Sequence, residues 1–167
     1  MDYFRRTMAV RYRLIQKSDN SALSKVIKSS LEQMDLALDG TVYTDQATDY
    51  MFGCYQDEGS IYFIAEQDGV LLGGSGIAPI PHQKGNYCEL QRMFLTEKAR
   101  GKGIGAALME KCLDFAKEHG YEMVYIETFE NMYAARKLYE RSGFEYSEER
   151  LGDTGHFSCN VFMNLWL

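Results

Sequence analysis

The pattern of apolar and polar positions along the chain predicts a protein that mixes strands and helices. Residues 10–16 alternate in polarity and SIYFIAE at 60–66 has the composition of a strand; both are typical of half-buried strands. The Gln-Asp-Gly at 67–69 that follows has the composition of a tight turn. Further strands are predicted at 70–80, 87–95 and 123–128, and two more within 144–167.

Apolar residues at helical spacing predict helices between these strands. Ser18 or Asp19 can cap the first helix, and Thr44 or Asp45 can cap a weaker second one. The clearest helix opens directly after a run of glycines, and Gly120 is a typical C-terminal stop for it. The predicted helices cover residues 18–30, 44–55, 104–118 and 132–142.

The resulting order is β-α-α-β-β-β-α-β-α-β-β, without an internal repeat or a linker. Three consecutive strands before the glycines predict an antiparallel half. The helical crossover at 104–118 predicts a parallel pairing after it. A chain of 167 residues suits one domain, so residues 1–167 are expected to form a single α/β (α+β) domain.

Charge and hydropathy exclude several function classes. The chain has 18 Lys and Arg against 24 Asp and Glu, a net charge of -6, which argues against general binding of nucleic acid. No apolar run approaches the ~18 residues of a membrane helix. The N-terminal stretch lacks the apolar core of a secretory signal, so we expect a cytoplasmic protein with no membrane partner.

Charge is also distributed unevenly. Residues 29–83 contain no Lys or Arg. This stretch is either a solvated acidic face or an acidic rim that attracts a cationic substrate. Its acidic residues are Glu32, Asp35, Asp39, Asp45, Asp49, Asp57, Glu58, Glu66 and Asp68.

The four cysteines, Cys54, Cys88, Cys112 and Cys159, show no metal-ligand or redox spacing. None of the three histidines stands beside them in a ligand pattern. We therefore expect reduced thiols in or near the core, and no metal site.

The glycines between the fourth strand, at 87–95, and the long helix predict an anion site. Gly101, Gly103 and Gly105 expose backbone N–H groups at a helix N-terminus, and Arg100 and Lys102 add positive charge there. The run also satisfies a dinucleotide fingerprint, but five polar residues separate it from its strand and too few βα units follow. A Walker A loop is absent, because no Gly-Lys-Ser/Thr follows.

This turn resembles a signature of the GNAT superfamily of N-acetyltransferases. Arg100-Gly-Lys-Gly-Ile-Gly105 is similar to the family's Arg/Gln-x-x-Gly-x-Gly/Ala motif, after a strand, CELQRMFL, and a polar TEKA. A second run, from Asn131 through Tyr139 to Gly143-Phe144, resembles the family's Asn-x-x-Ala…Tyr…Gly-Phe segment. Together the two motifs span roughly residues 87–146, in the family's order and spacing.

The resemblance implies a fold and a donor. The fold is a central mixed, mostly antiparallel sheet of six or seven strands, flanked by about four helices and splayed in the middle where CoA binds. The donor is acetyl-CoA, with its pyrophosphate on the glycine turn, its pantetheine arm along the preceding strand and on Asn131, and its 3′-phosphate near Arg136 or Lys137. The implied contact residues are Met93, Phe94, Leu95, Arg100, Gly101, Lys102, Gly103, Ile104, Gly105, Ala106, Asn131 and Arg136.

The chemistry of acetyl transfer to an amine needs a base and an acid. The acceptor amine must lose a proton, and the leaving thiolate benefits from gaining one. By resemblance Glu89 is the expected base, with Glu127 as the runner-up, and Tyr139 is the expected acid. A backbone N–H at 93–95 is expected to meet the oxyanion. The acceptor is expected to be a small-molecule or peptide amine, and a cationic one fits the acidic stretch.

The sequence leaves several assignments open. His156 either reaches the acceptor pocket or is an ordinary turn histidine. Four residues of the second helix region either wall that pocket or belong to the core: Tyr43, Tyr50, Met51 and Tyr55. The chain is either an enzyme or a CoA-binding module without catalysis, and either a monomer or a homodimer. Binding of ATP or NAD at the glycine turn is a third possibility.

Overall fold

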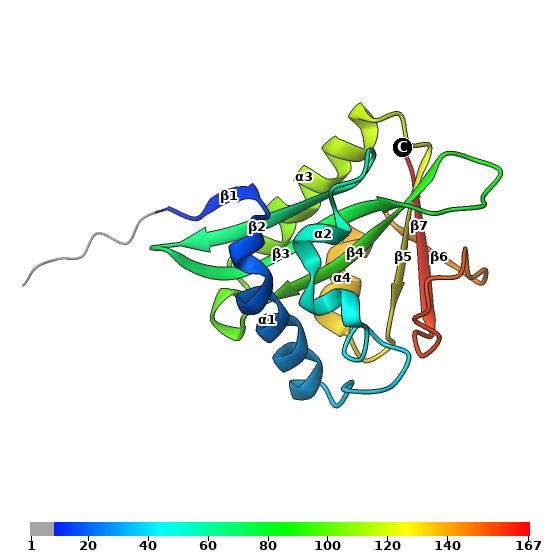
Figure 1. The fold of residues 1–167 in the computed structure, drawn as a ribbon. Coiled ribbons are helices and arrows are strands. Elements are labelled where there is room, and N and C mark those ends of the chain that lie inside the picture. The colour runs from blue at the N-terminus through cyan, green and yellow to red at the C-terminus, as the bar shows by residue number, and fades with distance from the viewer. Residues whose placement is uncertain (1–8) are drawn as a thin grey trace, which may run out of the picture.

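A computed structural model describes residues 9–167, which build a seven-stranded sheet (Figure 1). The strand order is β1-β2-β3-β4-β5-β7-β6. Only β4 and β5 pair in parallel; all other neighbours in this sheet are antiparallel. The strands are β1 (Arg11–Leu14), β2 (Ile61–Gln67), β3 (Val70–Pro79), β4 (Tyr87–Leu95), β5 (Met123–Thr128), β6 (Glu145–Ser147) and β7 (Val161–Trp166).

Four α-helices cover the two faces of the sheet (Figure 1). α1 and α2 lie on one face, over the core around Leu23, Met51 and Tyr62. α3 and α4 lie on the other, over the core around Cys112 and Val124. The mixed sheet and flanking helices expected from the sequence are confirmed. The helices are α1 (Asn20–Gln33), α2 (Met51–Cys54), α3 (Ile104–Glu118) and α4 (Tyr133–Arg141), and short 3-10 turns cover Lys17–Asp19, Gln46–Asp49 and Glu97–Ala99.

Two local predictions differ from the structure. Asp19 stands before α1, but its side chain makes no cap to that helix; it accepts the Gln16 N–H and pairs with Arg13 at 2.7 Å. The predicted helix at 44–55 is divided into a 3-10 turn and α2, because Tyr50 leaves the helical conformation at φ -128°. Asp45 does cap the first of these turns, through the Ala47 N–H.

The sheet opens in its middle, between β4 and β5. The two strands pair only over Tyr87–Glu89 and Met123–Tyr125, although β4 continues to Leu95 and β5 to Thr128. Beyond Glu89 the facing edges of both strands are therefore free to accept another chain of hydrogen-bonding groups. This is the splay that the resemblance implies.

A bulge in β4 decides which side chains face this opening. The pairs made by Gly74 and Gly76 leave two β4 residues opposite one β3 residue. Arg92 takes φ 48° there, and the hydroxyl of Tyr62 donates to its carbonyl oxygen at 2.7 Å. Because the bulge shifts the alternation by one residue, Arg92 faces the same side of the sheet as Glu89.

The cysteines are unpaired, as expected, but not all of them belong to the core. Cys88 and Cys112 are fully buried, whereas Cys159 is half-buried and Cys54 is exposed. Cys54 therefore corrects the expectation of core thiols. Within residues 9–167 no helix is both long and apolar enough to cross a membrane.

Candidate functional site

The glycine turn has the geometry of an anion site. Gly101 and Gly103 adopt φ 71° and 77°, which other residues rarely reach, and α3 starts at Ile104. No atom comes within 4 Å of where a Cβ would stand on either glycine, so the turn is open to a ligand. Gly105 has a different role: a Cβ there would meet the Leu138 side chain at 3.3 Å, so glycine allows α3 to approach α4. The free N–H groups of the first turn of α3 point out of this open end.

The other expected donor contacts lie on both sides of the splay. Met93, Phe94 and Leu95 lie at the end of β4 that is not paired with β5, and exposed Asn131 follows β5. Arg100 and Arg136 both make hydrogen bonds within the protein. Arg100 bonds the Leu95 carbonyl at 3.3 Å and Ser30 at 3.2 Å, which ties the turn to β4 and α1.

Arg136 lies on α4 and reaches away from the turn. Its guanidinium donates to the Glu130 carbonyl at 2.6 Å and to the Tyr146 hydroxyl at 2.9 Å. A role for Arg136 at a 3′-phosphate requires exchange of these bonds, and stays a prediction.

A pocket passes through the splay and joins the two faces of the sheet. Glu89 comes to it from the face covered by α1 and α2, and Tyr139 comes from α4 on the opposite face. The sequence thus identified two residues, 50 positions apart, that the fold brings to one cavity. Its lining is Leu31, Thr41, Val42, Glu89, Leu90, Gln91, Arg92, Met93, Phe94, Glu127, Thr128, Phe129, Met132, Tyr139, His156 and Cys159.

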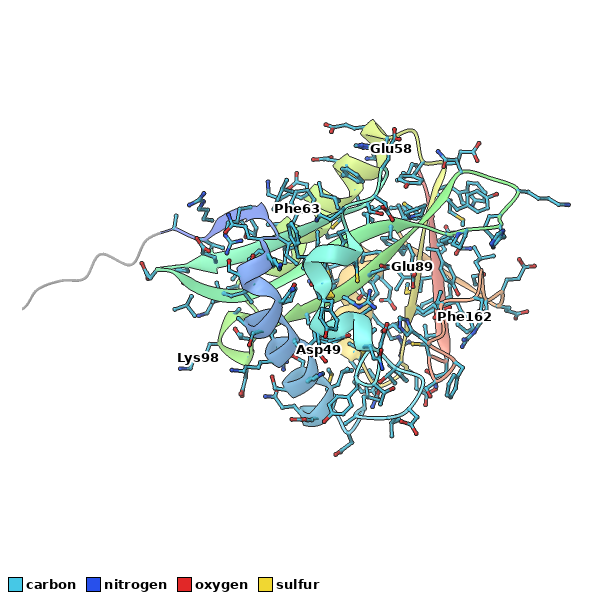
Figure 2. All side chains as sticks on the ribbon, viewed as in Figure 1. Asp49, Glu58, Phe63, Glu89, Lys98 and Phe162 are labelled. Atoms are coloured by element: carbon cyan, nitrogen blue, oxygen red, sulfur yellow. The ribbon has the colours of Figure 1, made fainter. Side chains whose placement is uncertain are left out.

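Glu89 is the most deeply buried carboxylate of the pocket. Only 6% of the residue is exposed, and Figure 2 shows it at the centre of the molecule, with Glu58 and Lys98 at the rim. Burial raises its pKa to about 7, and the negative charge of Glu127 adds to the rise, while the amide of Gln91, at 2.6 Å, opposes it. A carboxylate with this pKa takes and releases a proton near neutral pH.

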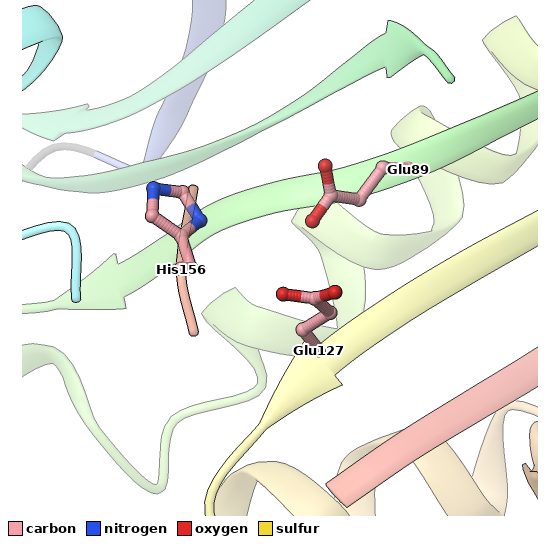
Figure 3. Close-up of side chains that lie close together, drawn as sticks. All are labelled: Glu89, Glu127 and His156. Carbon is pink, nitrogen blue, oxygen red and sulfur yellow. The ribbon is translucent and has the colours of Figure 1, made fainter. Parts of the chain in front are cut away.

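Glu127 and His156 complete a cluster around this carboxylate. Figure 3 shows the three side chains turned toward a common space, with Glu89 on β4, Glu127 on β5 and His156 on the loop before β7. One donor atom from each lies within 4.8 Å of the others. Glu127 is oriented by Tyr125, at 3.0 Å, and by Thr154, at 2.9 Å. His156 therefore reaches the pocket, which the sequence left open.

Asp45 holds the histidine and a buried arginine together. Its carboxylate accepts from Arg92 at 2.6 Å and from the Nε2 atom of His156 at 3.2 Å. Burial alone would raise the pKa of Asp45, but the Ala47 N–H, Arg92 and His156 hold it below its usual value. The sequence did not single out Arg92, and the only signal available was its place in the same strand, between Glu89 and Met93.

Tyr139 presents a protonated hydroxyl to the pocket. The residue is 5% exposed, and burial raises the pKa of its phenol. Within residues 9–167 no hydrogen bond from its hydroxyl is found, so this donor is available to a ligand. Its ring packs against Phe144, at a centroid distance of 6.1 Å, which fixes its direction.

The tyrosines expected near the acceptor pocket are not among its lining residues. Met51 and Tyr55 are buried in the core, Tyr50 is 68% exposed, and Tyr43 bonds Glu32 at 2.7 Å. Thr41 and Val42, from the same segment, line the pocket instead. Of the acidic stretch only Asp45 reaches the cluster, since Asp49 pairs with Lys28 and Glu66 pairs with Arg13.

Solved structures of acetyltransferases share this fold. An acetyltransferase from Streptococcus agalactiae 2603 superposes with a TM-score of 0.81 over 95% of this chain and 98% of its own, at 17% identity. The PaiA N-acetyltransferase from Thermoplasma acidophilum, solved in complex with coenzyme A, gives a TM-score of 0.74 over 96% of this chain and 100% of its own, at 15% identity.

Comparison with curated sequences gives more similar relatives. An N-acetyltransferase of Escherichia coli (strain K12), YjgM, is 35% identical over 152 residues, which is 90% of this chain and 91% of that protein. Human N-acetylaspartate synthetase is 38% identical over 99 residues, but these are 59% of this chain and only 31% of the synthetase. The Acetyltransferase (GNAT) family model matches residues 28–144. Because that match covers more than half of its length, the chain belongs to the GNAT family of acetyltransferases, and it is an acyltransferase.

Proposed function

We propose that this protein transfers an acetyl group from acetyl-CoA to a primary amine of a small molecule or peptide. The observation that carries the proposal is the pocket through the splay, which places a carboxylate of raised pKa, Glu89, and a protonated phenol, Tyr139, on opposite sides of one opening. A thioester held in that opening has a base on one side and an acid on the other. The coenzyme A complex of the PaiA neighbour supports the choice of donor.

The donor binds along the free edge of β4. The pyrophosphate sits on the N–H groups after Gly101 and Gly103, and the amides of the pantetheine arm pair with Met93, Phe94 and Leu95. This arrangement directs the thioester toward the middle of the splay. A backbone N–H of this strand is the donor expected at the oxyanion, since such groups are fixed before the reaction.

Glu89 removes the proton from the acceptor. The ammonium loses one proton to Glu89, the amine nitrogen attacks the thioester carbonyl, and the carbon–sulfur bond of the tetrahedral intermediate breaks as Tyr139 protonates the departing thiolate. The nitrogen loses its second proton to solvent as the amide forms, and solvent returns a proton to Tyr139. Glu127, on the adjacent strand, provides a second carboxylate group within 4.8 Å of the same cluster. Two carboxylates at this point favour a cationic acceptor.

Tyr139 protonates the leaving thiolate, and its removal is the third-largest effect that we expect. Tyr139→Phe keeps the ring and its packing but removes the proton, so kcat should fall by about 10²-fold, within the range for one proton transfer. The KM for acetyl-CoA should change little. Steady-state kinetics followed by thiol release measure both constants, and a variant with unchanged kcat would contradict the assignment.

Thermal unfolding with acetyl-CoA, NAD or ATP tests the donor. A ligand at ~100 times its Kd adds ~2.7 kcal/mol of stability, which raises the unfolding midpoint of this chain by several degrees. We expect a shift with acetyl-CoA alone, and a shift with NAD or ATP alone would contradict the proposal. A panel of amines read by thiol release follows. Binding of acetyl-CoA without release on any amine would favour a module without catalysis.

A further inference from the structure

The cluster of Glu89, Glu127 and His156 also has the composition of a transition-metal site. Its three donor atoms, all within 4.8 Å of one another, come from β4, β5 and the loop before β7. In a tetrahedral zinc site, with bonds of about 2.0–2.2 Å, ligand atoms stand roughly 3.3–3.6 Å apart, so small rotations of the side chains suffice. We propose that the protein binds one Zn²⁺ through Glu89, Glu127 and His156, and that this ion blocks the acceptor site.

A buried oxygen of Glu89 points to such a ligand. Glu89 is more than nine-tenths buried, and its Oε2 accepts from Gln91 at 2.6 Å. In the described part of the chain no hydrogen bond reaches its Oε1. Figure 3 shows the carboxylate aimed at the space between Glu127 and His156. When both carboxylates are ionised they repel each other, and a cation bound between them removes that repulsion.

Each of the three side chains is oriented from outside the cluster. The far nitrogen of His156, Nε2, bonds Asp45 at 3.2 Å, and Figure 3 shows the other ring nitrogen turned toward the two carboxylates. Thr154 bonds Glu127 at 2.9 Å. A carboxylate on the far nitrogen of a histidine is the arrangement that fixes metal-binding imidazoles, because it sets the tautomer and the direction of the ring.

The donor set selects the class of metal. One imidazole and two carboxylates suit Zn²⁺, whereas Mg²⁺ and Ca²⁺ prefer oxygen ligands only. Three protein ligands leave a fourth position open to the pocket, where water or an amine can bind. Cys159 lines the same pocket but is not part of the cluster of donor atoms within 4.8 Å of one another.

The effect on acetyl transfer rests on the proposed function. Zn²⁺ would occupy the place of the acceptor's ammonium and would engage the base itself. The donor site on the glycine turn and the end of β4 would remain accessible. Inhibition should therefore be competitive with the amine and should not be overcome by acetyl-CoA.

Metal binding is measured first, without any turnover. The full-length protein, stripped with a chelator, is titrated with Zn²⁺ against a chromogenic zinc indicator, and with Co²⁺ for its visible absorption bands. We expect one Zn²⁺ per chain, with affinity reduced more than about tenfold in Glu127→Gln and in His156→Gln. The matched controls are Glu118→Gln, His82→Gln and Cys54→Ser, at exposed positions outside the cluster, and they should bind as the unmodified protein does.

Absence of zinc binding, binding that survives both ligand variants, or binding lost in Cys54→Ser would each overturn the proposal. The acetyl-CoA thermal shift, which uses other residues, should persist in every variant and shows that each one is folded. Zinc binding in a protein that acetylates no amine would support the metal site while the proposed function fails. An active enzyme that binds no zinc would support the proposed function and contradict the metal site.

Discussion

Replacing Glu89 by glutamine should reduce kcat by about 10²–10⁴-fold, the largest effect that we expect. The substitution keeps the size of the side chain and an oxygen that can accept from Gln91, but it cannot take a proton from the amine. It also removes a charge whose burial is costly, as its pKa of about 7 indicates, so the folded protein should be as stable as before or more stable. The variant should therefore have a lower kcat and an unfolding midpoint that is the same or higher.

The pH profile gives a second measurement on the same residue. A base works in its deprotonated form, so kcat/KM for the amine with the metal-free enzyme should fall as the pH drops through about 7, where Glu89 of the free enzyme becomes protonated. The glutamine variant should lack this limb of the profile. Glu127→Gln is the matched comparison, because Glu127 lies in the same cluster on the adjacent strand. If Glu89→Gln kept its activity while Glu127→Gln lost it, the base would be Glu127 and not Glu89.

Removing the carboxylate of Asp45 should destabilise the fold by about 3 kcal/mol. Asp45→Ala leaves the guanidinium of Arg92, whose side chain is 7% exposed, without its anionic partner, and breaking such a buried pair costs ~3–5 kcal/mol. Water can reach part of this site, since 29% of the Asp45 side chain is exposed, which lowers the cost. Loss of the cap on Ala47 adds ~1 kcal/mol. Together these effects should lower the unfolding midpoint by roughly 6–12 °C.

Two further variants test whether the unpaired charge of Arg92 causes the loss of stability in Asp45→Ala. Asp49→Ala, at the end of the same 3-10 turn, breaks an exposed pair with Lys28 of α1 and a hydrogen bond from Ser24, and should cost about 1–2 kcal/mol. The double variant Asp45→Ala/Arg92→Met removes both charges and should regain stability relative to Asp45→Ala. Urea or thermal unfolding measures all three. If the double variant were the less stable one, Asp45 would stabilise the protein by some route other than its pair with Arg92.

Much of the fold could be predicted because its signals are local. Alternation located β1, strand-like composition located β2, the glycine run located the start of α3, and Gly120 follows the observed end of that helix by two residues. Glu89 and Tyr139 followed from short motifs around them. Each of these signals lies within a few residues of the feature that it predicts.

The features that the sequence did not reveal depend on contacts between distant segments. The bulge at Arg92 arises from the register of β4 against β3, and no property of CELQRMFL distinguishes it from a regular strand. The link from Asp45 through His156 spans 111 positions along the chain. The second predicted helix is divided at Tyr50 into a 3-10 turn and α2, and nothing in the sequence of residues 44–55 indicates that division.

The splay gives the protein a strand edge in an unusual position. Edge strands at the rim of a sheet offer a flat template to which strands of other proteins can add, and this is a common route to aggregation. The free edge of β4 beyond Glu89 lies instead inside the sheet, with β5 diverging from it on the far side. A pleated strand with side chains on both faces is too bulky for that wedge, whereas a thin linear chain with amides along it can enter. The position of this inner edge thus favours a slender cofactor arm over a polypeptide, whereas the outer edges of the sheet are formed by β1 and β6.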